Sequence, residues 1–347
     1  MQNPPNTSNR RRNLSVVARA AVAATLLLAA CGDDGDEEGS DPTTTTEAVD
    51  DGTTTTTERS TEDEGSDGEV DPLGAVTVEV IDAGEEPRRE LRVAVEPGTE
   101  HPVTTRMRQE ISIDVRGQTQ ETASATEQAV VYVVDSVEDG VISVTTKYQG
   151  GRVLDDVAID PATRRGLEEV LGLFEDAEGS ATYDQRGALI SLVPPSLEGA
   201  PPQIAPALET MIDSMESQAA QMSVPFPEEP VGAGAVWRVS ASLDMAGLPF
   251  EIVTEVALTE VSDTEVSGTI DQTLTIVPGP VEVQGVAAEV VEGEMAGGGT
   301  ISWPLDRPVA LTTQELDGTV VMRFEDPSGE KIELTQRLYQ SIELLAK

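Results

Sequence analysis

The alternation of apolar and polar residues from about residue 73 to the C-terminus is the feature that most constrains the fold of this chain. Val76, Val78 and Val80 are separated by polar residues, which is the two-residue period of a β-strand with one buried face. The same spacing predicts further strands at 91–95, 107–115, 129–134, 141–148, 182–192, 236–243, 250–258, 265–276, 281–291, 309–324 and 332–344. Long antiparallel strands must protect their edges and bury one face, so we expect a strongly curved sheet or half-barrel.

Two stretches in the middle of the chain change from strand spacing to helical spacing. The first follows Asp160-Pro161, an N-cap residue before a proline at the first helical position. Its apolar residues recur at helical intervals: Leu167, Val170, Leu171 and Phe174. The second apolar stripe is longer: Ile204, Leu208, Met211, Ile212, Met215, Ala219 and Met222. Two amphipathic helices in a strand-rich chain predict an α+β protein, predominantly antiparallel β, with both stripes turned toward the concave face of the sheet.

The two halves of the strand-rich region resemble each other. Residues 130–147 align with 254–271 at a shift of 124, and residues 179–189 align with the stretch that lies 122 positions later. Because the two shifts nearly coincide, we expect an internal duplication of a β unit. The repeat units are placed at about 98–196 and 232–345.

The charge of the chain is strongly negative and unevenly spread. Asp and Glu number 64 against 22 Lys and Arg, which gives a net charge of −42. Residues 1–31 carry +4 and residues 32–72 carry −15, which leaves −31 for residues 73–347. A polyanion repels phosphate backbones, so a nucleic-acid partner is excluded.

The N-terminus has the organisation of an export signal. Arg10-Arg11-Arg12 precede an apolar run from Ala20 to Ala30, which is shorter than the roughly 20 residues that a spanning helix needs. The run ends in Leu28-Ala29-Ala30-Cys31, which resembles the lipobox of bacterial lipoprotein signal peptides. An ordinary secretory signal and a buried Cys are the alternatives. Export by the Sec or the twin-arginine route stays open.

The lipobox resemblance implies that residues 1–30 are a signal peptide that is removed before Cys31. It also implies that the thiol of Cys31, the single cysteine of the chain, is diacylated. Two acyl chains give stable attachment to a membrane. We therefore expect a lipid-anchored protein on the extracytoplasmic face of a bacterial cell membrane, with the membrane as its partner through the anchor.

Residues 31–72 have the composition of a disordered tether. They are dominated by Asp, Glu, Gly, Ser and Thr, with threonine runs at 43–46 and 53–57. Such a segment has too little apolar surface to offset the entropy of ordering. Its function is either a plain spacer or a glycosylated stalk. Residues 73–347 then form the β-rich extracytoplasmic domain.

Two stretches of the domain resemble a family of uncharacterised bacterial lipoproteins. They are Glu85–Arg92 and Pro225–Trp237, and the most specific part is the Pro-Val-Gly-x-Gly-x-x-Trp sequence from Pro230 to Trp237. The family supplies no catalytic residues to transfer to this chain. A looser resemblance in layout is to bacterial lipoprotein carriers with a half-barrel sheet and inward helices, which concerns fold and not function.

The sequence does not contain the usual arrangements of catalytic residues. It has no Gly-x-Ser-x-Gly nucleophile elbow, no His-Glu-x-x-His zinc motif and no phosphate-binding loop. His101 is its single imidazole and follows a turn, so we expect an exposed loop residue. We therefore expect no enzymatic activity, no cofactor and no metal site. A carboxylate-based hydrolase remains the unfavoured alternative, because glycoside hydrolysis needs only two acids.

The methionines of the second helical stripe are the candidate ligand site. Met211, Met215 and Met222 share one face with Leu208, and methionine adapts to varied apolar surfaces. They predict an apolar groove for an acyl chain, and ordinary core packing is the alternative. We therefore expect non-enzymatic binding of an amphiphilic lipid or envelope component. A structural or protein-interaction module without a cavity is the second hypothesis.

Overall fold

The computed structural model describes residues 76–196, 212, 215, 219, 223–245, 248–283, 286–325 and 329–347. The predicted signal peptide, Cys31 and the acidic tether lie outside the described residues. The strands, in chain order, are β1 (Thr77–Asp82), β2 (Glu100–Val115), β3 (Gln118–Glu138), β4 (Val141–Val153), β5 (Glu178–Asp184), β6 (Leu189–Val193), β7 (Val236–Met245), β8 (Leu248–Val261), β9 (Glu265–Ile276), β10 (Gly279–Val283), β11 (Val286–Pro304), β12 (Leu311–Glu325) and β13 (Lys331–Ala346).

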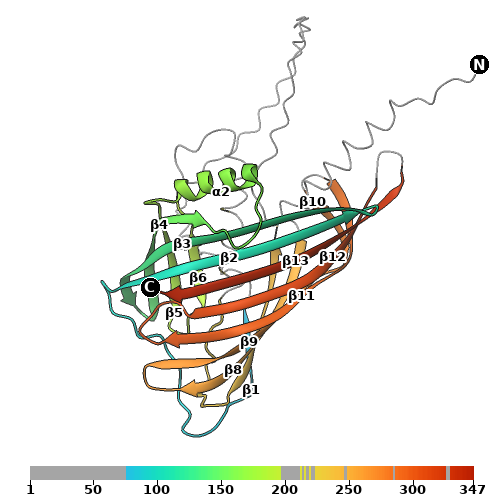
Figure 1. Cartoon of the computed structure of the whole chain (residues 1–347). Helices are drawn as coiled ribbons and strands as arrows, with labels where there is room; N and C mark the ends of the chain where they lie inside the picture. The colour runs from blue at the N-terminus through green and yellow to red at the C-terminus, as the bar shows by residue number, and fades with distance from the viewer. Residues whose placement is uncertain are drawn as a thin grey trace, which may run out of the picture.

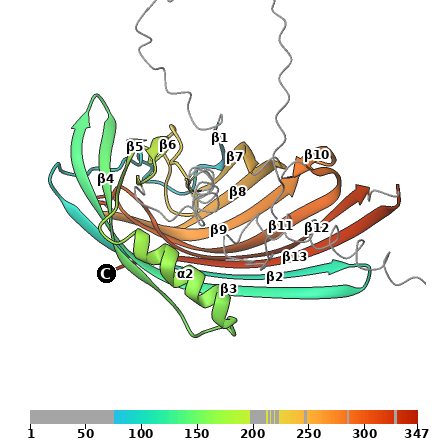
Figure 2. The ribbon, with the colours of Figure 1, turned by 90° about the horizontal axis from the view of Figure 1, so that it is seen from above.

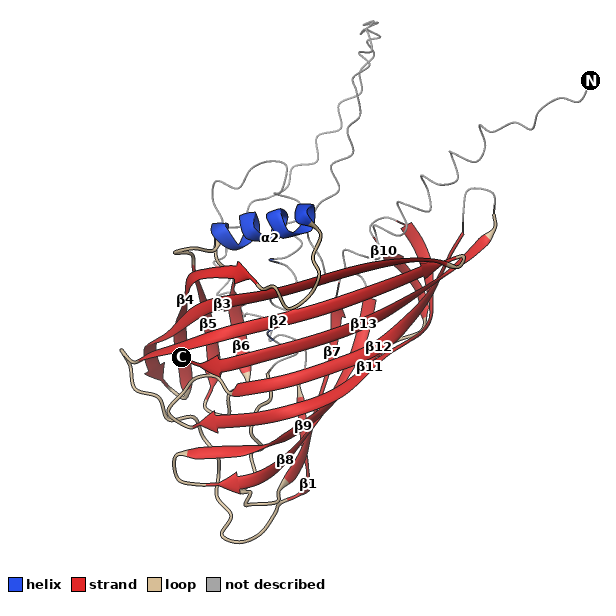
Figure 3. Cartoon of the chain, in the orientation of Figure 1, coloured by secondary structure: helices blue, strands red, loops and turns tan. Residues whose placement is uncertain are grey.

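The thirteen described strands form one antiparallel sheet (Figures 1 and 3). Their order is β1-β7-β8-β9-β11-β12-β13-β2-β3-β4-β5-β6, and β10 pairs with β11 beside this path. Figure 2 shows that the sheet curves strongly into the shape of a bowl. β3 and β4 lie on one side of the bowl, and β7 and β8 lie on the opposite side. The curvature of the predicted sheet is therefore confirmed, and most of its strands bury alternate residues on one side.

The first predicted helix is confirmed as α2 (Pro161–Leu173). The carboxylate of Asp160 accepts hydrogen bonds from the backbone N–H groups of Ala162 at 3.0 Å and Thr163 at 3.1 Å. This is the N-cap that the sequence predicts before a proline. Just after the helix, Phe174 packs edge-on against Tyr148 of β4, with ring centroids 5.3 Å apart. The helix therefore lies against the upper part of β4 (Figure 1).

The predicted α+β class with two amphipathic helices is wrong. The described part of the chain is almost all antiparallel β, with 66% of the described residues in strands and 7% in helix. Most of the second apolar stripe lies outside the described residues. Of its members only Ile212, Met215 and Ala219 are described, and each is helical and half-buried. Several strands, including β2, β3 and β4, are longer than predicted, because polar residues continue them beyond the apolar runs. In β3, for example, the segment 118–128 precedes the predicted strand 129–134.

The two predicted repeat units have the same strand order. β2-β3-β4-β5-β6 are neighbours in the first unit, and β7-β8-β9-β11-β12 are neighbours in the second, which has β13 as an additional strand after β12. Between the third and fourth strands the first unit carries α2, whereas the second carries β10. Duplication as the origin of this likeness stays a prediction.

The segment 89–96, which includes the predicted strand 91–95, is a loop that closes one end of the curved sheet. The backbone N–H of Val93 donates to the carbonyl of Gln185 at 2.8 Å, and that of Ala94 donates to the carbonyl of Leu305 at 2.6 Å. These acceptors lie in the turns after β5 and after β11, so the loop joins the two sides of the bowl. Apolar and polar residues alternate in this loop because Leu91 and Val93 are buried in the core, although the loop is not part of the sheet.

Candidate functional site

The inner face of the sheet is the face whose side chains meet across the bowl. Val134 of β3 and Val144 of β4 belong to the same apolar cluster as Trp237 of β7 and Val256 of β8. These strands lie far apart in the strand order, so only the concave side can bring the side chains together. We call this side the inner face and the opposite side the outer face.

The inner face of the thirteen described strands carries no charged residue. Trp237 and Val256 are inner residues, and the register of the strand pairs defines the inner positions of all other strands. No Asp, Glu, Lys or Arg occupies one of these positions. The charged residues of the strands all occupy outer positions. Because the domain is strongly acidic, this separation of charge between the two faces is the main chemical feature of the sheet.

Two apolar clusters lie at the two ends of the inner face. The closed-end cluster lies beside the loop 89–96 and includes Phe226, Trp237 and Trp303. The rings of Phe226 and Trp303 are 4.5 Å apart, and the indole N–H of Trp237 donates to the carbonyl of Pro225 at 3.2 Å. Trp237 is 1% exposed and is a core residue of this cluster. The far-end cluster includes Ile113, Val320, Met322, Leu334 and Leu338.

A row of uncharged polar side chains separates the two clusters. We call it the polar row, and its members are Thr254, Gln272, Gln314, Gln340 and Gln109. The amide N–H of Gln272 donates to Oγ1 of Thr254 at 2.9 Å, and the amide N–H of Gln314 donates to Oε1 of Gln272 at 2.9 Å. Four of the five side chains are buried, and Gln314 is half-buried.

Two glycines explain how Gln272 and Gln314 meet. β11 runs between their strands, and its inner positions beside them are Gly297 and Gly299. Since neither glycine has a side chain, the amides of β9 and β12 reach across β11 and form the hydrogen bond. A Cβ at Gly297 would lie only 1.9 Å from the carbonyl oxygen of Glu315, so the strands approach too closely for any other residue.

Gln336 is a buried polar residue of the inner face whose side-chain amide makes no hydrogen bond within the described residues. It is 1% exposed, and neither its amide nitrogen nor its amide oxygen has a hydrogen-bond partner in the described part of the chain. Its neighbours across the ladders are Val320 and Ile113. The amide is therefore enclosed by the far-end cluster.

The middle of the inner face is less covered than the two apolar clusters. Met107, Thr126, Gln128, Gln314 and Leu344 are half-buried inner residues of β12, β13, β2 and β3. We call this group the central section. Its border includes Gly151 of β4, which pairs with Gln128. Leu171 of α2 packs so closely on Gly151 that a Cβ added there would lie 2.9 Å from Cδ2 of Leu171. A ligand would thus displace less protein at the central section than at either apolar cluster.

Even the titratable side chains of the inner face are neutral at pH 7. Tyr132, Tyr148 and Tyr183 lie on adjacent strands, and burial raises the pKa of all three phenols, that of Tyr132 to about 12. Burial, together with the charge of Arg307, lowers the pKa of His101. His101 lies in β2 and is 9% exposed, so the expectation of an exposed loop residue was wrong.

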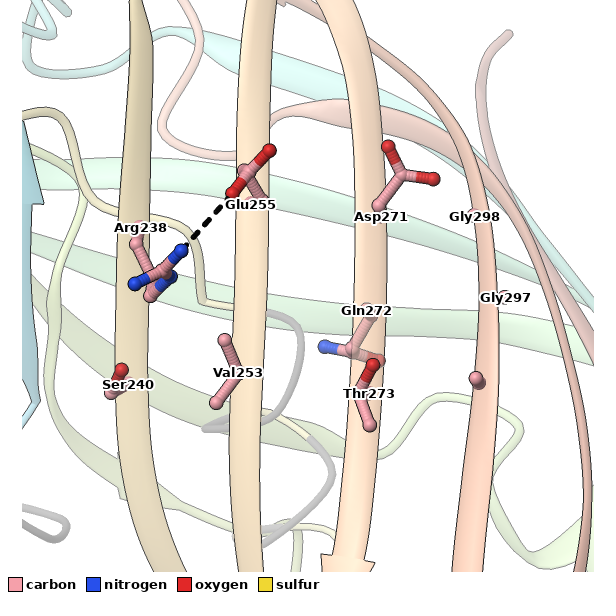
Figure 4. Close-up of a pocket in the computed structure, with 10 residues that line it drawn as sticks. Arg238, Ser240, Val253, Glu255, Asp271, Gln272, Thr273, Gly297 and Gly298 are labelled. Carbon is pink, nitrogen blue, oxygen red and sulfur yellow. Dashed lines mark hydrogen bonds and ion pairs between the residues drawn. The ribbon is translucent and has the colours of Figure 1, made fainter. Parts of the chain in front are cut away.

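The outer face has the opposite chemistry. A depression of about 1060 Å³ lies over β7, β8, β9 and β11. Figure 4 shows the residues that line it. Arg238 and Glu255 form an ion pair of 3.4 Å at its rim, beside Asp271. The hollow exists because the outer positions of β11 there are Ala296 and Gly298. Its polar walls do not suit an acyl chain.

The predicted methionine groove is described only in part. Met215 is helical and half-buried, whereas Leu208, Met211 and Met222 lie outside the described residues. The polar row and Gln336 were missed, because a binary pattern treats each of them only as an interruption of an apolar stripe. The signal available in the sequence was Gly297-Gly298-Gly299 within an apparent strand, which marks a close approach of other groups.

The described residues contain no group of three or more His, Cys, Asp or Glu side chains placed to hold a metal ion. No helix in the described part of the chain is long and apolar enough to cross a membrane.

Comparisons with known proteins give no family. No family model matches the sequence, and no curated protein matches it. Among solved structures, OccK8 of Pseudomonas aeruginosa is 7% identical, with 73% of this chain and 100% of that chain covered and a TM-score of 0.20. OpdQ of the same organism is 6% identical, with coverages of 71% and 97% and a TM-score of 0.20. At these TM-scores the likeness carries no argument.

Proposed function

We propose that this chain is a lipid-anchored protein of the extracytoplasmic face of a bacterial membrane and that its inner face binds an amphiphilic ligand without catalysis. The observation that carries the proposal is the absence of charge from every inner position of the described strands. A concave face with two apolar clusters and an uncharged polar row offers both surfaces that an amphiphile needs.

Acyl chains supply the binding energy in this proposal. Burial of each CH₂ group stabilises a complex by about 0.8 kcal/mol. The central section is less covered than either apolar cluster, and Met107 and Leu344 provide its apolar contacts. Met215, the one described member of the predicted groove, is half-buried and helical.

A structural or protein-interaction module is the second candidate. The burial of both apolar clusters favours it, because a filled core leaves no volume for a ligand. The carboxylate-based hydrolase has no support from the inner face, because no described strand presents a carboxyl group there.

The membrane anchor is tested at Cys31. In the full-length chain, Cys31→Ala should move the protein from carbonate-washed membranes to the soluble fraction, because no acyl chain can be attached. Retention in the washed membranes would contradict the anchor.

Ligand binding is tested with residues 31–347 carrying Cys31→Ala, which we call the unacylated chain. It is the expected mature form without its lipid. Purified from bacterial cells and examined by native mass spectrometry, it should carry a co-purified amphiphile. Met107→Asp should abolish this adduct, because it places a carboxylate in the central section, whereas Thr104→Asp on the outer face of the same strand should retain it.

Circular dichroism of both variants checks that the sheet is intact. An unacylated chain without any bound amphiphile, or equal adducts in the two variants, would favour the structural module instead.

A further inference from the structure

The unpartnered amide of Gln336 is the least explained polar group on the inner face. Buried polar groups in proteins are nearly always hydrogen-bonded. The amide nitrogen and oxygen of Gln336 have no hydrogen-bond partner within the described residues, and the side chain is 1% exposed. An apolar residue of similar shape would pack there without this cost. The amide is therefore explained best by a group that the described part of the chain does not supply.

The surroundings of Gln336 restrict the group that can bind it. Leu334 and Leu338 flank it on the inner face of β13, and Val320 and Ile113 lie opposite. All four are buried members of the far-end cluster. The site thus offers one polar contact in an apolar setting, which suits a small polar group joined to hydrocarbon.

The inner face also determines whether the bound group can carry a charge. An ionised head group would lose its water and meet no counter-charge, since no inner position of the described strands holds a charged residue. An amide side chain offers two hydrogen-bond donors and an acceptor. It therefore matches a hydroxyl or an amide, each of which both donates and accepts.

We propose that the ligand of the inner face is an uncharged amphiphile with a small hydroxyl or amide group, and that Gln336 is its polar anchor. This inference rests on the proposed function and specifies its ligand class. A diacylglycerol, with one free hydroxyl beside two acyl chains, is the simplest compound of that class.

Two lipids that differ in one group test the ligand class. The unacylated chain is delipidated and titrated by native mass spectrometry with 1,2-dioleoylglycerol and with dioleoylphosphatidic acid, which has a phosphate in place of the hydroxyl. We expect the diacylglycerol to bind at least about tenfold more tightly, because a buried unpaired charge is disfavoured. Equal or tighter binding of the phosphatidic acid would overturn the assignment.

Gln336→Leu tests the anchor with two readouts. Without ligand, its unfolding midpoint should rise, because it removes an unmet buried amide. Its affinity for dioleoylglycerol should fall about tenfold. Gln120→Leu, at an exposed inner position of β3, should change neither quantity. Gln336→Met serves in the same way if the leucine variant does not fold.

The outcomes separate the two proposals. If neither lipid binds the unmodified chain, the proposed function fails and this inference fails with it. If both lipids bind and Gln336→Leu leaves the affinities unchanged, amphiphile binding stands and the role of Gln336 is refuted. A lower unfolding midpoint in Gln336→Leu would show that the amide stabilises the fold, which also refutes it.

Discussion

The two faces of the sheet are built from the same strands and have opposite chemistry. On β8, Val256 lies on the inner face and is 0% exposed, whereas Val253, three residues earlier, lies on the outer face and is 37% exposed. On β3, Glu127 pairs with Arg106 on the outer face, between the uncharged inner residues Thr126 and Gln128. The two-residue period of the strands therefore places the charged residues on the outer face and the uncharged residues on the inner face.

The outer face keeps the protein soluble more than it stabilises the fold. Glu127 accepts hydrogen bonds from Arg106 and Arg152, both at 2.8 Å, and Arg106 also lies 3.6 Å from Glu343. Exposed ion pairs of this kind contribute about 0–1 kcal/mol each. The net charge of the domain opposes self-association, while the inner face supplies the burial that stabilises the sheet.

A charge placed on the inner face breaks the comparison most severely. Val256→Asp buries a carboxylate between Trp237 and Ile270, with no partner. We expect the free energy of unfolding to fall by about 3–5 kcal/mol, as for other unpaired buried charges. The measurement is urea unfolding of the unacylated chain.

Val253→Asp is the matched control on the same strand. Because its side chain points outward and is partly exposed, we expect a change within about 0.5 kcal/mol. Similar losses in the two variants would mean that the faces do not differ in their tolerance of charge.

The alternation of the sequence predicted which face most strands bury and that the sheet curves. The cap at Asp160 and the following apolar stripe predicted α2 correctly. Both signals are local, because they depend on residues within a few positions of one another. The prediction failed at 91–95, where the same alternation belongs to a loop, since strand spacing reports burial on one side and not hydrogen bonding to a neighbour.

The inner polar residues could not be predicted from the same pattern. Gln109 and Gln340 lie opposite each other on β2 and β13, although more than 200 positions separate them in the sequence. Their alignment depends on the register of the ladder, which is a long-range property. A binary pattern records glutamine only as an interruption of an apolar stripe, so the polar row and Gln336 were missed.

Removing a partnered polar side chain should have a smaller effect than adding a charge. Gln272→Leu leaves Thr254 and Gln314 without the hydrogen bonds that they make to its amide. We expect the free energy of unfolding to fall by about 1–3 kcal/mol, the cost of buried groups that lose their partners. Urea unfolding of the unacylated chain measures it.

Gln336→Leu gives the informative contrast, because the same substitution is expected to stabilise the ligand-free protein. If Gln272→Leu were also stabilising, the polar row would not hold the strands β8, β9 and β12 together. The inner face would then tolerate apolar residues throughout.

The smallest expected effect lies on the outer face and depends on pH. Hydrogen bonds from Arg106, and then from Arg152, hold the pKa of Glu127 below its usual range. A carboxyl with a lowered pKa stabilises the fold above its unfolded pKa of about 4.3, and this contribution is lost as the pH falls through the folded value. Glu127→Gln should therefore cost at most about 1 kcal/mol at pH 7, and the difference from the unmodified chain should shrink below about pH 4.

Glu121→Gln, at an exposed outer position of the same strand, is the control, and we expect it to change the free energy of unfolding by less than Glu127→Gln at pH 7. Urea unfolding at several pH values distinguishes the two. A cost of Glu127→Gln that persists unchanged into acid would mean that its packing matters rather than its charge. The outer face would then contribute to stability in the same way as the inner face, and the distinction between the two would be one of solubility alone.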